Sequence, residues 1–170
     1  MMSVLVLFLL HALSLYFTGT WRKWKEYYST VQYVIIGDFS YNILFSDRLL
    51  WRYEVLFDHR IADLYYAFII FPCVVMLFLR YYPKGLLKEL LYIMSWTTFY
   101  SIIESISVKN GSMTHFDGWN IYWSGGIYFF GFILIRLHYK YPLVVWPVSL
   151  GFAIATMIIF QQPFHFMAYR

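Results

Sequence analysis

Charged residues are scarce in this sequence, and their scarcity excludes the most common class of protein. Only 13% of the residues are Asp, Glu, Lys or Arg, whereas a typical soluble domain contains about 25%. Apolar residues make up 61% and the mean hydropathy is +0.58. A soluble core built by 170 residues could not bury this much apolar surface, and the excess would lie exposed in water. Contact with lipid is the simpler explanation.

Cysteines and recognised catalytic motifs are also nearly absent. Cys73 is the sole cysteine, so no disulfide can form within the chain. The sequence has no P-loop, no H-E-x-x-H, no G-x-S-x-G and no Cys–His zinc pattern, and it therefore indicates no cofactor. The net charge is +4, but the basic residues are spread between apolar stretches. That distribution favours a lipid bilayer rather than a nucleic acid as the partner.

Six apolar stretches approach the roughly 20 residues that a transmembrane helix needs. We predict a single all-α domain over residues 1–170, a transmembrane bundle with spans at about 1–18, 28–45, 62–79, 86–108, 119–135 and 143–160. Asp38 and Asn42 interrupt the second stretch, so five spans are the alternative. The first stretch lacks a positively charged start and an A-x-A cleavage site, which favours an uncleaved span over a signal peptide.

The charges between these stretches alternate in a way that predicts the topology. Three connections are basic, and they contain Arg22, Lys23 and Lys25, then Arg80, Lys84 and Lys88, then Arg136, His138 and Lys140. In the other two, acidic residues balance the basic ones. Because cytoplasmic loops carry an excess of Lys and Arg, we expect the basic loops inside and both termini outside. The expected location is a plasma membrane, and a bacterial cytoplasmic membrane in particular.

Polar residues at membrane depth are costly, and they therefore usually face a partner or a wet cavity. Asp38 is expected near the midplane, with Asn42 one turn later on the same face. His11 is expected at a similar depth and could pair with Asp38. The candidate polar pocket consists of Asp38, Asn42, Asp63, Ser101, Glu104 and Asn120. The alternative interpretation is that these groups only join helices by hydrogen bonds.

A weaker pattern concerns metal binding at the outer side of the bundle. His59 and Asp63 are four residues apart, so both can lie on one helical face, and His115 is expected at the same depth. Imidazole and carboxylate groups are zinc ligands. His59, Asp63 and His115 are therefore candidate metal ligands, although solvated helix ends commonly contain the same residue types.

Several segments together resemble a known group of proteins. They are the run from His115 to Ser124, the run from Arg136 to Pro142, Asp63-Leu64-Tyr65-Tyr66-Ala67, and Pro72-Cys73. In these segments the chain resembles an uncharacterised family of small bacterial multi-pass membrane proteins. The resemblance implies a bacterial plasma membrane, and it implies no activity, ligand or catalytic residue.

Three functions remain open at this point. The first is a transport or sensing protein with a polar path from the outer face to the midplane, formed by Glu104 and Asp38. The second is a membrane enzyme that acts on lipid or an outer-leaflet substrate through Glu104, Asp63 and His59. The third is an accessory subunit bound to a membrane protein partner, or a homo-oligomer, in which the polar residues only hold helices together.

Overall fold

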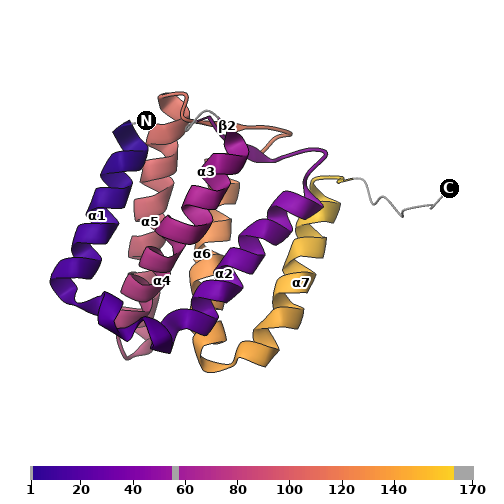
Figure 1. Cartoon of the computed structure of the whole chain (residues 1–170). Coiled ribbons are helices and arrows are strands. Elements are labelled where there is room, and N and C mark those ends of the chain that lie inside the picture. The colour runs from indigo at the N-terminus through magenta and orange to yellow at the C-terminus, as the bar shows by residue number, and fades with distance from the viewer. Residues whose placement is uncertain (1, 55–57, 163–170) are drawn as a thin grey trace.

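The computed structural model describes residues 2–54 and 58–162, and 79% of the chain is helical. Six helical rods lie side by side (Figure 1). They are α1 (Met2–Thr18), α2 (Trp24–Leu44), the continuous rod of α3 (His59–Tyr65), η2 (Tyr66–Ile70) and α4 (Phe71–Arg80), α5 (Leu86–Lys109), α6 (Ile121–Lys140) and α7 (Pro142–Ile159). The predicted all-α class is confirmed. Met1, where the first span was expected to begin, lies outside the described residues.

Most helix ends agree with the predicted spans, and two differ. Helix α2 begins four residues earlier than predicted, after the short 3-10 helix η1 (Thr20–Lys23), because Trp24, Lys25 and Glu26 continue the helix. Helix α6 continues to Lys140. The early start of α2 shifts Asp38 along the rod. Asp38 lies four residues, or about 6 Å, past the middle of α2 and six residues, or about 9 Å, before its end at Leu44, so it is displaced from the middle toward that end.

Two of the rods are long and apolar enough to cross a membrane by length and composition. They are His59–Arg80, with 22 residues and a mean hydropathy of 2.1, and Pro142–Ile159, with 18 residues and a mean hydropathy of 2.0. Half of the first is buried inside the protein, as in a core helix, whereas only 11% of the second is buried. Among the described residues this criterion therefore supports two spans, and it does not establish the six that were predicted.

The ends of the rods form two faces with different charge. At one end lie η1, the connection 81–85 and Tyr141; at the other, α1 begins and α2 and α7 end (Figure 1). The first, here called the basic end, has eight basic and two acidic residues: Arg22, Lys23, Lys25, Arg80, Lys84, Lys88, Arg136 and Lys140, with Glu26 and Glu89. The opposite, acidic end has four basic and seven acidic described residues: Arg48, Arg52, Arg60 and Lys109, with Asp38, Asp47, Glu54, Asp58, Asp63, Glu104 and Asp117.

A short antiparallel ribbon, which the sequence analysis did not predict, joins two loops at the acidic end. Strand β1 (Trp51–Tyr53) pairs with β2 (Met113–His115), and Trp51 lies opposite His115. The ribbon connects the segment after α2 with the segment after α5. Tyr41 supports it from α2, because its hydroxyl accepts the N–H groups of Leu50 and Trp51 at 3.0 and 3.1 Å, and its ring stacks on Trp51.

The rod from His59 to Arg80 contains one widened turn. In η2 the N–H of Phe71 donates to the carbonyl of Tyr66, five residues earlier, so this turn is a π-helix. Pro72 follows directly and cannot donate to the carbonyl of residue 68, as a regular α-helix would require. Single π turns of this kind are frequent at functional sites. This one lies between the polar start of the rod and its apolar remainder.

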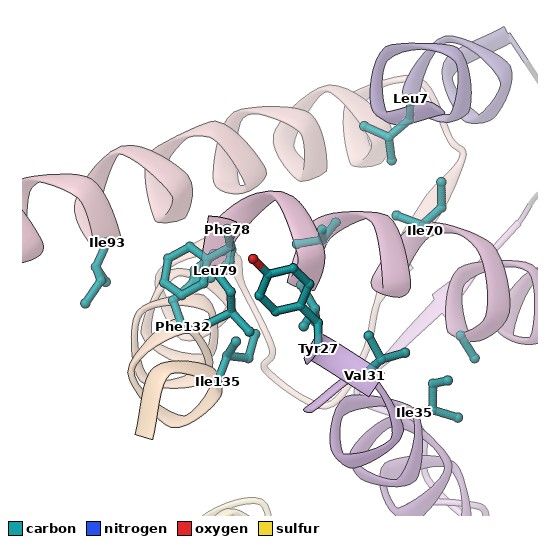
Figure 2. Packing of buried hydrophobic residues seen from close by; sticks show 13 residues of the cluster. Leu7, Tyr27, Val31, Ile35, Ile70, Phe78, Leu79, Ile93, Phe132 and Ile135 are labelled. Atoms are coloured by element: carbon teal, nitrogen blue, oxygen red, sulfur yellow. The ribbon is translucent and has the colours of Figure 1, made fainter. Parts of the chain in front are cut away.

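The core lies around α4, with α2, α5 and α6 packed about it (Figure 2). Phe78 is 0% exposed, and its ring contacts those of Tyr92, Trp96 and Phe132 at centroid distances of 4.8 to 5.9 Å. Leu79, Ile93 and Ile135 complete this part of the cluster. Three rings from two helices, α5 and α6, therefore meet at one side chain of α4.

We predict that Phe78→Ala destabilises the protein by about 3 kcal/mol. This is the lower end of the range for a buried phenylalanine, because detergent also solvates the ring after unfolding. The free energy of unfolding in mixed micelles measures the effect. Phe130→Ala is the matched control, because Phe130 is 51% exposed on α6 and its loss should change stability by less than about 1 kcal/mol. Equal losses from both variants would contradict the assignment of the core.

Candidate functional site

A cavity of about 900 Å³ opens at the acidic end, between the end of α2, strand β1 and the start of α3. Its lining includes Phe39 and Asn42 from α2, Tyr53 from β1, and His59 and Asp63 from α3. Arg52, Glu54, Asp58 and Arg60 surround these groups. Of the predicted pocket residues, Asn42 and Asp63 thus lie on one cavity, together with His59 from the predicted metal set.

Local hydrogen bonds fix the start of α3. Asp58 has extended backbone and caps the helix, because its carboxylate accepts the N–H of Arg60 at 2.7 Å. The next residue, His59, then lies one turn before Asp63, and the distance from His59 Nε2 to Asp63 Oδ2 is 3.2 Å. The N–H of Tyr53 donates to His59 Nδ1 at 3.4 Å. A neutral imidazole that accepts at Nδ1 has its proton on Nε2. This nitrogen is buried and has no hydrogen-bond partner in the described part of the chain, so its contact with Asp63 is close but is not a hydrogen bond.

Asp38 approaches the same region from α2. Its charge lies within electrostatic range of Asp63, although the two residues belong to different helices. Oδ2 of Asp38 is buried and has no hydrogen-bond partner in the described part of the chain. Asn42 follows one turn later, and its side-chain amide donates to the backbone carbonyl of Asp38 at 3.1 Å. A carboxylate on the cavity lining, Asp63, and one on a second helix, Asp38, are therefore near enough to interact, and Asp38 has a buried oxygen without a partner in the described part of the chain.

Glu104 forms a second polar centre, on α5. Its Oε1 accepts hydrogen bonds from His115 Nε2 at 2.7 Å and from the hydroxyl of Ser124 at 2.5 Å, and its Oε2 accepts one from Tyr128. The indole N–H of Trp119 donates to Ser124 at 2.8 Å. Glu104 is buried, and both of its oxygens are occupied by donors from β2 and α6. Its geometry is that of a connection between elements.

Three tyrosines lie between the two centres. The ring of Tyr53 stacks on that of Tyr66 at 4.2 Å, and both phenols are within electrostatic range of Tyr128. Burial, and after it the neighbouring Tyr66, raises the pKa of the Tyr53 phenol well above its usual range, so the hydroxyl keeps its proton at neutral pH. Tyr53 lines the cavity and Tyr128 donates to Glu104, so these rings link the two centres, and Glu104 itself is not among the lining residues.

The remaining predicted site residues have local roles. Asn120 caps α6, because its Oδ1 accepts the N–H of Tyr122 at 3.0 Å. Ser101 faces Gly125 of α6, where a β-carbon would lie 3.6 Å from its hydroxyl, so a small residue allows the two helices to approach. His11 donates to the carbonyl of Leu7 and accepts the hydroxyl of Tyr100 at 2.6 Å. It therefore pairs with α5 and not with Asp38.

The predicted metal ligands do not form one group in the part of the chain that is described. His59 faces Asp63, whereas His115 donates to Glu104. No set of three or more His, Cys, Asp or Glu side chains is grouped there as metal ligands would be. These residues share a depth along the helices, and depth does not determine on which side of a helix a residue lies.

Two tyrosines of the site were not identified from the sequence. Tyr128 lies one turn after Ser124, so this i,i+4 spacing on α6 could have indicated a second donor toward Glu104. Tyr53 had no comparable signal, because it reaches the cavity through the pairing of β1 with β2.

We predict that Glu104→Gln destabilises the protein by about 2 kcal/mol, because the amide presents one acceptor oxygen where the carboxylate presents two and leaves a buried donor unpaired. Thermal or chemical unfolding in micelles measures the change. Glu89→Gln makes the same substitution on the same helix, where the contact with Tyr82 is 3.4 Å long, and it should be close to neutral. A neutral Glu104→Gln variant would contradict the structural role of this carboxylate.

Comparison of the chain with known protein families, with characterised proteins and with solved structures finds no match. The chemistry of the site is therefore the basis for inferring its function.

Proposed function

We propose that the chain is a multi-pass protein of the bacterial plasma membrane whose cavity binds a small polar solute from the outer face, for transport or sensing. The bacterial location rests on the sequence resemblance. The membrane topology and the solute site rest on different observations and are tested separately.

Helix length supports six spans. The rods contain 17, 21, 22, 24, 20 and 18 residues in chain order, and a transmembrane helix has about 17–25. Large apolar side chains are exposed on them, including Leu86 at 87% and Leu143 at 84%. Apolar surface of this extent is unfavourable in water and suitable for lipid. Polar groups inside α2, α5 and α6 lower their mean hydropathy, and many of those groups are bonded within the bundle.

Charge supports the orientation. The basic end has an excess of Lys and Arg, and the acidic end has an excess of carboxylates. In a bacterial membrane the positively charged end is cytoplasmic. This orientation gives both termini, the β1–β2 ribbon and the cavity an outer position.

Topology is tested by single cysteines in intact cells, with Cys73 replaced by serine. We expect Lys109→Cys at the acidic end to react with a membrane-impermeant maleimide added outside, and Lys84→Cys at the basic end to react only after the cells are opened. Both lysines are exposed, so accessibility within the fold is matched. Labelling of Lys84→Cys in intact cells would contradict this orientation.

The cavity carries the functional proposal. A volume of about 900 Å³ lies within the range of ligand sites, about 300–1,000 Å³. Asp63 on its lining meets the His59 imidazole, and Asp38, next to the lining, has a buried carboxylate oxygen without a hydrogen-bond partner in the described part of the chain. Buried polar groups without partners are costly unless a ligand or water satisfies them. A polar solute that enters from the outer face would supply a partner to Asp63 on the lining.

The other two functions have less support. The enzyme hypothesis requires Glu104 to act together with His59 and Asp63, but Glu104 accepts three hydrogen bonds and is not among the residues that line the cavity. An accessory subunit would need no cavity, and no solute would stabilise it.

The solute site is tested on the purified protein in micelles by thermal unfolding with alanine, choline, glucose and acetate. We expect at least one of these solutes to raise the midpoint temperature of unfolding, because a ligand that binds only the folded state stabilises that state. Asn42→Leu places an apolar side chain in the cavity and should abolish the shift. Ser40→Ala removes a similar bond to the α2 backbone without changing the lining, and it should retain the shift.

Proteoliposomes then show whether the bound solute crosses the bilayer, and Asp38→Asn should reduce any flux. Binding with flux indicates transport, and binding without flux indicates sensing. If none of the four solutes shifts the midpoint, or if Asn42→Leu leaves the shift unchanged, the cavity is not the binding site that we propose.

A further inference from the structure

The charges around the cavity do not cancel at its inner part, which is formed by Phe39, Tyr53, His59 and Asp63 with Asp38 near them. The nearest cation of the lining, Arg52, is already neutralised, because its Nε and one terminal nitrogen donate to Glu54 at 2.9 and 2.7 Å. The other, Arg60, is exposed to the surroundings. The inner part therefore has an excess of carboxylate.

Among the described residues, neither inner carboxylate has a cationic side chain as partner. Asp63 is 9% exposed, and its contact is the His59 imidazole, whose Nδ1 is occupied by the N–H of Tyr53. Oδ2 of Asp38 has no hydrogen-bond partner in the described part of the chain. Buried charges are normally paired, and a cation is the group that would pair with these two carboxylates.

The walls indicate what kind of cation fits. Phe39 and Tyr53 both line the cavity; Phe68 contacts the first ring edge to face, and Tyr66 stacks on the second. Aromatic faces attract ammonium groups, and quaternary ammonium ligands are commonly bound in this way. A bare metal ion instead needs several converging oxygen ligands, and the described residues offer no such group. The volume also exceeds the needs of one ion.

We propose that the inner part of the cavity binds a small organic cation, with an ammonium group held against Asp63, close enough to Asp38 to be attracted by its charge, and with its alkyl groups against Phe39 and Tyr53. This inference rests on the proposed function and specifies its solute class. The opening lies at the acidic end, so the cation enters through the face whose charge attracts it. Asp58 lies on the same lining and adds a negative charge there.

Choline and its uncharged carbon analogue, 3,3-dimethyl-1-butanol, test the inference by calorimetric titration of the purified full-length protein. The two have nearly the same shape and differ in charge. We expect choline to bind at least about tenfold more tightly than the analogue, and Asp63→Asn to weaken choline binding by about tenfold or more. Asp63→Glu, which keeps the charge, should restore part of the affinity.

Asp117→Asn is the matched control. It removes one negative charge from the same end, outside the cavity lining, and Asp117 has a φ of +50°, a conformation that asparagine also tolerates. Choline affinity should change less than about twofold, a loss typical of an exposed charge. An equal loss in Asp117→Asn and Asp63→Asn would show general attraction to the acidic end and would overturn the inference.

The remaining outcomes separate this inference from the proposed function. If choline does not bind but alanine, glucose or acetate stabilises the protein and Asn42→Leu abolishes the effect, the cation assignment is wrong and the solute site stands. If none of the four binds, both fail. Equal binding of choline and its carbon analogue would also overturn the cation assignment, because charge would then make no contribution.

Discussion

The acidic end depends on three hydrogen bonds to one carboxylate, that of Glu104. They connect α5 to His115 on β2 and to Ser124 and Tyr128 on α6. Strand β2 then holds β1, and the backbone of Tyr53 on β1 holds the ring of His59. A buried side chain on one helix thus determines, through a two-stranded ribbon, how an imidazole at the start of another helix is oriented.

The two polar centres of the bundle have opposite hydrogen-bonding conditions. Glu104 has a donor for each oxygen and belongs to the framework, because a fully bonded buried group fixes the elements around it. Asp38 and Asp63 have fewer partners than their oxygens can accept. A protein retains such groups at a cost in stability, and functional sites are where that cost is usually found. This difference separates the cavity from the rest of the polar residues more clearly than their depth does.

Hydrophobic length allowed most of the helices to be predicted, because a run of about 20 apolar residues between charged loops has few other structures available. The predicted start of the second helix was wrong, because this part of the chain is amphipathic. Trp24, Lys25 and Glu26 have the composition of an interfacial loop, but they form the first turn of α2. The ribbon could not be predicted, because each strand has three residues and its partner is about 60 positions away.

Side-chain partners were harder to predict than helices for a geometric reason. Counting residues gives the height of a group along a helix, and it brings Glu104 near His115. It does not give the direction around the axis, which depends on neighbouring helices, and His11 therefore meets Tyr100 rather than Asp38.

The π turn between Tyr66 and Ile70 controls the direction around the helix axis in which Asp63, the carboxylate on the cavity lining, points. A π turn accommodates one residue more than an α turn, and each residue of a helix rotates the face by about 100°. The rod can therefore present Asp63 to the cavity and Phe78 to the core without bending. Deletion of one residue from this turn would make the rod a regular helix. Its apolar half would then keep its place, and Asp63 would turn away from Asp38. The extra residue shifts the helical register, so that the two halves of one helix contact neighbours on different sides.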